Sequence, residues 1–581
     1  MTTAHSLPQY DLITTSRLED LQHSILGSND RLVAVDTETT GLNWLDDKAF
    51  GVSLAWDNQA AFIRNTDFGA DQIGVLMTEL FKADHKVFVF HNAEFDLHMI
   101  RETYGAYPPK NILDTLRISH LRNPKPPHGL KELATVAYGP GAAACEDTIK
   151  AYIKQYKLKD YSQVPSEFMD PYACMDTVLT KGWAHLYMDE VKEEYPKLFQ
   201  LEHMLIPIIL EMEHQGIKID LDYIDILHRQ YLAEQRSIQD DIYKIVGRSM
   251  EVSSPKQLQN YFYDQLGIKP PRETAGGGRS TDETSLQSIT HPVGSKVAEL
   301  VLRWRSIEKV DSTYVQPYQN TARNSRLHPR WNAMGAITGR FSSSSPNLQN
   351  IPADKKVRRM FVPDREFFDF DYSQVEMRMM AHASQQHNLI QSFNDGTDLH
   401  AYTASLVFNT TPDQVDKEQR QIGKRLNFGA IYGGGSKGLA RQCNITQTQA
   451  RTFLNQLWDA YPVMKGWVER TKRNAERDGY VRTIHGRKIP VLAEDSFKAP
   501  NYLIQGTAGD IIKISLVKTA QYVQSIGGCI RNTVHDQILF DEVDESAIPD
   551  IREIMEDFSF SMPVTVDLQR STESWGDLIH E

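Results

Sequence analysis

The chain has 581 residues, 40% of them hydrophobic, and a formal net charge of −13 at pH 7. This length predicts roughly three or four compact units, and the apolar content is sufficient for ordinary globular cores. The negative charge argues against a uniformly basic protein that coats a polyanion, so any such contact has to come from local patches.

Two further features of the composition concern the compartment. The four cysteines form no metal-binding or redox spacing, which predicts a reducing environment; they are Cys145, Cys174, Cys443 and Cys529. The N-terminal segment lacks the basic and apolar blocks of a signal peptide, and no apolar run is long enough to span a bilayer. We therefore expect a soluble, cytoplasmic protein with no membrane partner.

The first element with recognisable chemistry is RLVAVDTETTGL, which predicts a buried strand that ends in Asp36 and Glu38. Their i, i+2 spacing places both carboxylates on one face of that strand. HNAEFDLHMI supplies Asp96, and PYACMDT supplies Tyr172 and Asp176, which are adjacent on a helix. Converging acids repel one another unless cations neutralise them, so the set predicts a metal site. An Asp-x-Glu pair alone is also typical of an ordinary surface strand end.

The middle of the chain predicts a junction followed by a helical unit. The acid-rich stretch 187–197 is the expected junction, and LEHMLIPIILEMEHQG after it predicts a helix. SSPKQLQ predicts a helix start with Ser254 as cap and Pro255 in the first turn, and 270–280 predicts a mobile loop. Basic clusters expected to follow phosphates are Arg303, Arg305, Lys309, Arg323, Arg326, Arg330, Arg340, Lys355, Lys356, Arg358 and Arg359.

Two later segments each end an apolar stretch in an aspartate. FFDFDYSQVEMRMMAH predicts a strand that delivers Asp371 and then a helix, and TVHDQILFDEV predicts a hairpin with Asp536 at its tip. Brought together, these acids suit two divalent metal ions about 3.5 to 4 Å apart, which stabilise both oxygens of an in-line phosphoryl transfer. Mg²⁺ prefers such hard oxygen ligands. Either aspartate alone is more simply interpreted as a cap or turn residue.

Between these segments, RQIGKRLNFGAIYGGG places Arg420, Lys424 and Phe428 on one stripe of a helix, with Tyr432 one turn further. The cations can clamp phosphates while the aromatic rings offer a flat surface to a base and sugar. A basic solvated face with Phe428 in the core explains the spacing equally well. The GGGSKG stretch lacks the Gly-Lys-Ser/Thr order of a phosphate-binding loop, so we reject that interpretation.

DYSQVEMR, R-x3-K-x3-F-x3-YG and VHD together resemble motifs A, B and C of family A DNA polymerases, in the family's order. TGRFSSSSPNLQNIP resembles a further signature of the family, and the N-terminal acid set resembles its 3′–5′ exonuclease domain, in the subclass with a tyrosine four residues before the last acid. The resemblance implies an α/β multi-domain fold: a ribonuclease H-like exonuclease domain (1–190), then a right-hand polymerase domain (191–581). The expected subdivisions are a thumb at about 200–325, a palm with 326–385 and 490–581, and fingers at about 386–489.

The resemblance also implies roles for individual residues. The metal ligands are expected to be Asp371, the backbone carbonyl of Tyr372, and Asp536 at one site, and Asp36, Glu38, Asp96 and Asp176 at the other. Tyr172 is expected to orient the attacking water, Asn92 to support that site, and Asp114 to be structural. Residues matching those that hold the incoming nucleotide are Arg420, Lys424, His400 and Phe428, and Glu376 matches the residue that crowds the sugar 2′ position. Those expected at the primer-template duplex are Arg340, Asn347, Gln349, Asn501 and Gln505, and Gln374, Tyr432 and His535 complete the substrate-binding set.

The implied activity is template-directed DNA synthesis with proofreading, with two Mg²⁺ per active site and Mn²⁺ as a substitute. The implied partners are primer-template DNA, deoxynucleoside triphosphates, and a replisome or processivity factor. Because nothing precedes the exonuclease segment, the chain looks like a phage enzyme, expected in the host cytoplasm, or like a large fragment. Two positions depart from the family pattern: Gln537 stands where Glu is common, and Phe497 where Arg is common, with Lys498 as a substitute cation.

Two other functional classes remain as alternatives. One is a dedicated 3′–5′ exonuclease whose second half has become a DNA-binding scaffold, an interpretation that Gln537 alone encourages. The other is a non-catalytic replisome adaptor, which the two intact acid sets disfavour. A primer-extension assay distinguishes a polymerase from the first alternative, because a dedicated exonuclease shortens a primer and never lengthens it.

Overall fold

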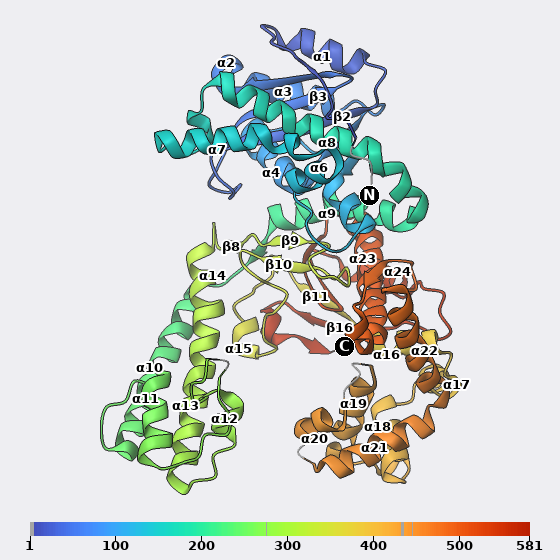
Figure 1. Cartoon of the computed structure of the whole chain (residues 1–581). Helices are drawn as coiled ribbons and strands as arrows, with labels where there is room; N and C mark the ends of the chain where they lie inside the picture. Colours follow the sequence, from blue (N-terminus) through green and yellow to red (C-terminus); the bar gives the residue numbers. More distant parts are fainter. Residues whose placement is uncertain (1–4, 275, 432–434, 444, 581) are drawn as a thin grey trace.

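The computed structural model describes four stretches of the chain, 5–274, 276–431, 435–443 and 445–580. Figure 1 shows an N-terminal α/β unit stacked on a central sheet, from which two helical arms project on the same side. We call residues 217–327 the first arm and residues 387–478 the second arm. Within the described stretches, no helix is both long and apolar enough to cross a membrane.

The N-terminal unit is built on a six-stranded mixed sheet in the order β1-β4-β3-β2-β5-β6. Its strand β2 (Leu32–Thr39) runs antiparallel to β3 and parallel to β5, and most of it is buried, which confirms the predicted buried strand. The other strands are β1 (Asp11–Leu12), β3 (Ala49–Trp56), β4 (Gln59–Arg64), β5 (Val87–Phe90) and β6 (Ile112–Asp114). The helices are α1 (Leu18–Gly27), α2 (Asn65–Phe68), α3 (Ala70–Phe81), α4 (Ala93–Tyr104), α5 (Thr115–Arg122), α6 (Leu130–Tyr138), α7 (Ala144–Tyr156) and α8 (Ser166–Glu194).

The predicted junction at 187–197 contains a helix break. Helix α8 ends at Glu194 and α9 (Pro196–Gln215) begins two residues later, with its proline in the first turn, where a missing N–H costs nothing. Position 190, expected as the end of the first domain, therefore lies inside the last turns of α8. Helix α9 leads from the N-terminal unit into the rest of the chain.

A buried carboxylate on α9 joins the two units. Glu202 is fully buried and pairs with Arg487 at 2.5 Å, with Lys513 at 2.6 Å and with Arg117 at 3.3 Å. Arg117 belongs to α5 of the N-terminal unit, whereas the other two cations lie near the central sheet, and Asp510 pairs with Arg487 at 2.7 Å. Burial by itself would raise the pKa of Glu202, but the three cations lower it to about 2.

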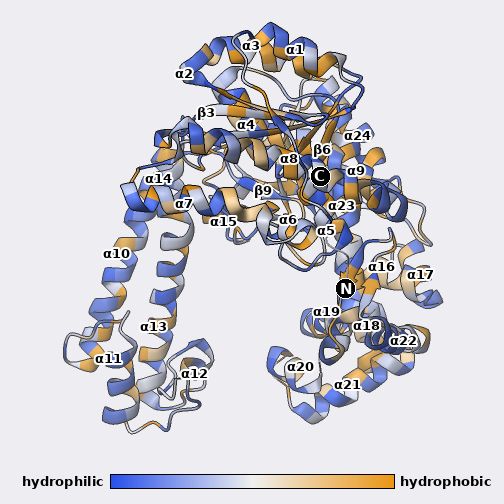
Figure 2. Cartoon of the chain, turned by 45° about the horizontal axis from the view of Figure 1, so that its top comes forward, coloured by the Kyte–Doolittle hydropathy of each residue, from blue (hydrophilic) through white to orange (hydrophobic). Residues whose placement is uncertain are grey.

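The first arm is a pair of long amphipathic helices, α10 (Leu221–Val246) and α13 (Pro292–Val310), and both show alternating hydrophobic and hydrophilic residues in Figure 2. The buried positions of α10 recur at steps of three or four residues, which is the spacing of helices that pair along one seam. Ser254 caps α11 through the Gln257 N–H, with Pro255 in the first turn, as predicted. The remaining elements are β7 (Ile217–Lys218), α11 (Pro255–Gln259), α12 (Glu283–Gln287), α14 (Gln316–Thr321) and β8 (Arg326–Leu327).

The central sheet has five antiparallel strands in the order β14-β15-β11-β16-β17. Strand β11 (Phe367–Tyr372) is the middle strand, and the long helix α23 (Ala499–Ser525) contacts β14 and helix α9. The other strands are β14 (Cys529–Val534), β15 (Gln537–Asp541), β16 (Val566–Ser571) and β17 (Ile579–His580). Neighbouring elements are β9 (Arg330–Asn332), β10 (Ser342–Ser344), α15 (Lys355–Arg358), α16 (Val375–Ser384), β12 (Tyr480–Arg482), β13 (Lys488–Pro490) and α24 (Ile548–Glu556).

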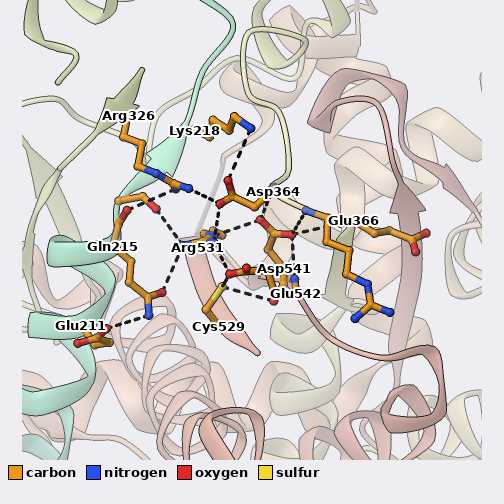
Figure 3. Close-up of polar contacts among 12 residues, drawn as sticks. Glu211, Gln215, Lys218, Arg326, Asp364, Glu366, Cys529, Arg531, Asp541 and Glu542 are labelled. Atoms are coloured by element: carbon orange, nitrogen blue, oxygen red, sulfur yellow. Dashed lines mark hydrogen bonds and ion pairs between the residues drawn. The ribbon is translucent and has the colours of Figure 1, made fainter. Parts of the chain in front are cut away.

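Arg531 on β14 ties this sheet to the base of the first arm (Figure 3). Its guanidinium lies 2.7 Å from Asp364 and 3.2 Å from Asp541, and it donates to the Gln215 side chain and the Gly216 carbonyl at the end of α9. Because a buried guanidinium needs acceptors for its several donors, this arrangement fixes the arm's attachment to the sheet.

Three of the basic residues expected to follow phosphates make contacts within the protein, and their contact with phosphates stays a prediction. Arg326 joins the cluster of Figure 3 through Asp364, and Arg323 pairs with Asp46 at 3.0 Å. Arg330 donates to the Leu42 carbonyl at 2.6 Å. Their acceptors come from segments far away in sequence, so local charge counting could not identify them.

The second arm consists of α17 (His387–Asn394), α18 (Leu399–Phe408), α19 (Lys417–Ile431), α20 (Ser436–Cys443), α21 (Gln447–Ala460) and α22 (Pro462–Asp478). A small separate core lies under α19 to α21. By contrast, one continuous apolar core runs from the N-terminal sheet through α9 into the central sheet and the first arm. The other face of the N-terminal sheet has a core of its own.

Two candidate active sites

The N-terminal acid set converges as predicted. Asp36 and Glu38 lie on β2, and Asp176 lies on α8, which packs against that strand. One carboxylate oxygen from each of the three lies within 4.8 Å of the other two. Glu38 and Asp176 are buried, so the sheet and the helix deliver three acids to one confined place.

Asp96 on α4 is held beside the same strand. One of its carboxylate oxygens accepts from the Thr37 backbone N–H at 2.9 Å and from the Thr37 hydroxyl at 2.7 Å. Thr37 lies between the two strand acids in sequence, so its contacts place Asp96 next to Asp36, although Asp96 is not one of the three clustered ligands. Its role as a metal ligand stays a prediction.

The electrostatics of this site fit a cation. Burial raises the pKa of Asp36 to about 7, and burial together with Asp36 raises the pKa of Glu38 well above its usual range. Burial and Asp36 also raise the pKa of Asp96. One oxygen of Glu38, Oε1, is buried with no hydrogen-bond partner among the described residues. Divalent ions with oxygen preference relieve both the repulsion and the orphaned oxygen.

Sequence reasoning missed a cation in this site. Lys131, on α6, forms an ion pair with Asp176, and its ammonium nitrogen lies 5.0 Å from the centroid of the Tyr172 ring. Nothing in the sequence around Lys131 marked it. Asp114, by contrast, is structural as expected, because it accepts from the backbone N–H groups of Asn92, Ala93 and Leu116.

The second site lies at one end of the central sheet. Asp371 occupies the end of β11 opposite Gln537 of β15, and Asp536 lies in the tight turn between β14 and β15. His535 in that turn has a positive φ of 56°. The Tyr372 backbone N–H donates to the Asp536 carbonyl at 3.1 Å, so the folded sheet sets the two predicted aspartates side by side.

Charge crowding is strong at this second site as well. Burial raises the pKa of Asp371 to about 7, with further increases from Asp536 and Asp369, and burial raises the pKa of Asp536. The Gln537 amide donates to Asp371 Oδ2 at 3.3 Å, which partly offsets the increase. The acids therefore suit a bound cation, and the departure at Gln537 replaces a fourth acid with a hydrogen-bond donor.

Several predicted substrate residues surround this pair. Arg340 pairs with Glu376 of α16 and donates to the Gln505 carbonyl of α23 at 3.2 Å, so it links these helices. Buried amide oxygens of Gln374 and Asn501 have no hydrogen-bond partner among the described residues, which leaves them available to a ligand.

Gln349, expected at the duplex, braces the hairpin that carries Asp536. Its amide nitrogen donates to the Thr533 carbonyl at 2.8 Å, and its amide oxygen accepts from the His535 N–H at 3.3 Å. Asn347 in turn accepts from the Gln349 N–H at 2.9 Å. A DNA contact of either residue stays a prediction, and the hairpin support is an additional role.

The predicted nucleotide residues lie on two packed helices of the second arm. Arg420 on α19 donates to Asp398 at 2.6 Å, and Asp398 caps α18 by accepting from the His400 N–H. His400 is buried, contacts the Asn427 amide at 3.1 Å, and burial lowers its pKa to about 4. Gly423 permits this packing, because a Cβ there would lie 2.3 Å from the His400 carbonyl oxygen.

The described residues include only part of the predicted helical stripe beyond Arg420, which consists of Lys424, Phe428 and Tyr432. Lys424 is exposed on α19, and that helix contacts α16 and α23 next to the Asp371 site. The Phe428 backbone belongs to α19, but its side chain, like the whole of Tyr432, lies outside the described residues. Phe497 is 47% exposed, and Lys498, the expected substitute cation, pairs with Asp495 at 2.8 Å.

Comparisons with known proteins agree with this architecture. Residues 221–577 match the family described as DNA polymerase family A, and residues 12–185 match the one described as 3'-5' exonuclease. DNA polymerase I of Synechocystis sp. is 31% identical over 97% of this chain and 62% of that protein. DNA polymerase I of Pseudomonas aeruginosa is 30% identical over 90% of this chain and 60% of that protein. The chain thus spans about three fifths of the length of these relatives.

A solved structure extends the agreement to three dimensions. The POL domain of Pol1 from M. smegmatis, in complex with DNA primer-template and dNTP, matches with a TM-score of 0.82 and 26% identity, covering 97% of this chain and 99% of that one. The fold and the two family matches place a polymerase-family domain after an N-terminal domain of the 3′–5′ exonuclease family. The chain belongs to DNA polymerase family A.

Proposed function

We propose that this protein copies a DNA template by adding deoxynucleotides to a primer 3′ end, and that it removes mispaired ends with a separate 3′–5′ exonuclease site. The observation that carries the proposal is the placement of Asp371 and Asp536 side by side at the end of the central sheet. Family membership and the complex formed by the M. smegmatis relative support it.

In synthesis, the primer 3′ hydroxyl attacks the α-phosphate of the incoming nucleotide, and pyrophosphate leaves. Asp371, Asp536 and the Tyr372 carbonyl would hold two Mg²⁺, which supply charge stabilisation for the attacking and leaving oxygens. Arg420 and Lys424 neutralise the triphosphate from α19. Phe428, one turn beyond Lys424 on α19, is the residue that we assign to the sugar of the incoming nucleotide. Arg340 holds Glu376 against the sugar, where its carboxylate crowds a 2′ hydroxyl.

In proofreading, the frayed primer end enters the N-terminal site, because a poorly paired end costs little to unstack. Asp36, Glu38 and Asp176, with Asp96 beside them, would hold two metal ions that activate water for hydrolysis. The Tyr172 hydroxyl orients that water. Thr37 keeps Asp96 in place through the two hydrogen bonds described above.

The finer assignments follow from this activity. The substrates are primer-template DNA and deoxynucleoside triphosphates, and a replisome or processivity factor is a further partner. Mg²⁺ is the working ion, with Mn²⁺ as substitute, and the protein acts in the cytoplasm, where the template and nucleotides are. The N-terminal domain runs to about residue 190, and the first and second arms are the thumb and the fingers.

Primer extension with Mg²⁺ and the four deoxynucleotides tests the proposal. We expect template-dependent lengthening that a chelator abolishes, and shortening of the same primer when nucleotides are omitted. Shortening under both conditions would favour the dedicated exonuclease, and no change under either would favour the adaptor.

Asp36→Ala combined with Glu38→Ala is expected to lower excision of a single-stranded oligonucleotide by about 10³-fold or more. The variant loses two clustered ligands, and the several kcal/mol that metal ions supply correspond to a factor of this size. Primer extension should persist within about twofold, because the synthesis site is built on another sheet. Persistent excision in a gel assay would remove the exonuclease assignment.

Phe428→Tyr is expected to relax discrimination against dideoxynucleotides by about tenfold or more, since an added hydroxyl near the sugar changes which 3′ group is accepted. The motivation is the position of Phe428 on α19, two turns beyond Arg420 and one beyond Lys424. The measurement is the ratio of kcat/KM for deoxy- and dideoxynucleotides. Phe408→Tyr, on α18, is the matched control. If Phe428→Tyr left the ratio of the two kcat/KM values unchanged, the assignment of Phe428 to the sugar would be wrong.

A further inference from the structure

Lys131 occupies an unusual position for a lysine. It lies in the first turn of α6, which packs against α8, and its ammonium group forms an ion pair with Asp176 Oδ1. The two side chains are only 14% and 11% exposed. A surface ion pair adds little stability, whereas removal of one partner of a buried pair is strongly unfavourable because it leaves the other charge uncompensated.

The same ammonium group also contacts the other functional side chain of α8. It lies 5.0 Å from the centroid of the Tyr172 ring, within the range of a cation–π contact. Tyr172 and Asp176 are one helical turn apart, so a single cation restrains both. Tyr172 also lies 5.9 Å from Tyr161, ring centroid to ring centroid.

Lys131 contacts an acid that is expected to bind a metal ion. Asp176 is one of three acids that each offer a ligand oxygen within 4.8 Å of the others, and Lys131 already contacts one of its two carboxylate oxygens. An ammonium group and a divalent cation at the same carboxylate repel each other strongly in a buried setting. They therefore compete for Asp176.

We propose that Lys131 is a positioning residue of the exonuclease site: it serves as a resident cation that holds Asp176 and Tyr172 in place when no metal ion is bound and moves aside from Asp176 when one binds. This role rests on the proposed proofreading function. It explains how three crowded acids fold together without metal, since Lys131 supplies the compensating charge.

The test uses the full-length chain with Asp371→Asn, which weakens the other metal site, and compares Lys131→Met with Lys131→Gln. Mn²⁺ binding is followed by electron paramagnetic resonance of the free ion, and the thermal midpoint is measured in EDTA and in Mn²⁺. The matched control is Lys82→Met, because Lys82 forms a 2.7 Å ion pair with Glu79 of α3 and has a 65% exposed side chain.

We expect both Lys131 variants to bind Mn²⁺ on the order of tenfold more tightly than the parent, because the competing charge is gone. In EDTA both should melt at a lower temperature than the parent, and Mn²⁺ should raise their midpoints more than it raises the parent's. Excision by the Lys131 variants with an intact Asp371 should reach half-maximal rate at lower Mg²⁺ but with a lower kcat, since Tyr172 loses its restraint.

Unchanged Mn²⁺ affinity in both variants, equal to that of Lys82→Met, would overturn the inference. Weaker Mn²⁺ binding would also overturn it, because Lys131 would then assist the metal ion. A failure of the proofreading function itself would give a different result, because the parent chain would not excise DNA. The Mn²⁺ affinities and thermal midpoints would still test whether Lys131 competes with the metal ion.

Discussion

Asp371→Asn is expected to lower primer extension by about 10³-fold or more while leaving single-strand excision within about twofold of the parent. Removing the charge weakens the hold on metal ions that supply several kcal/mol of charge stabilisation, and each 1.36 kcal/mol is a factor of ten. Excision survives because its acids come from β2 and α8, not from the central sheet. The measurement is a gel assay of both reactions on one preparation.

Asp567→Asn is the matched control for this prediction. Asp567 lies directly opposite Asp371 in the register of β11 and β16, but its side chain is exposed. We expect primer extension within about threefold of the parent, since an exposed charge is screened by solvent. Equal loss of synthesis and excision in Asp371→Asn would contradict the separation of the two sites.

Glu202→Gln is expected to lower the free energy of unfolding by about 3–5 kcal/mol, because it leaves buried cations without their counter-charge. The three cations, Arg117, Arg487 and Lys513, all lie within 3.3 Å of the carboxylate. Urea unfolding followed by circular dichroism measures the loss. Glu194→Gln removes an exposed 2.8 Å pair with Arg482 and is expected to cost at most about 1 kcal/mol.

The effect of Glu202 also depends on pH in a defined direction. Burial opposes ionisation, but Lys513, Arg487 and Arg117 lower the pKa of Glu202 from 4.5 to about 2. The folded state therefore gains stability from the carboxylate above pH 4.5, and this gain is lost as the pH falls toward 2. The difference between the parent and Glu202→Gln should shrink over that interval. A constant difference from pH 6 to pH 2 would show that charge is not the cause.

Local patterns were sufficient to predict the parts of the molecule that depend on neighbouring residues. The strand carrying Asp36, the helix cap at Ser254 and the hairpin at Asp536 all follow from alternation, capping and turn chemistry, and the structure confirms them. The break between α8 and α9 also lies within the acid-rich stretch 187–197 that was predicted as a junction. The family resemblance added the pairing of distant acids that no local pattern contains.

Long-range partners could not be predicted in this way. Arg326 carries the same charge as a phosphate-binding arginine, and only the fold shows that it forms an ion pair with Asp364. Lys131 meets Asp176 across 45 residues of sequence, and Gln349 meets the hairpin across 184. Such contacts depend on how elements pack, so they become visible only when the whole chain is folded.

The continuous apolar core through α9 constrains how the proposed proofreading can work. Residues from the N-terminal sheet, such as Val89 and Leu113, and from the central sheet, such as Phe370 and Phe540, belong to one packed interior. A close-packed interior resists relative displacement of its halves. The proposed synthesis site and the proposed exonuclease site are therefore held at a fixed separation. Removal of a mispaired nucleotide then requires the primer end to move from the first site to the second.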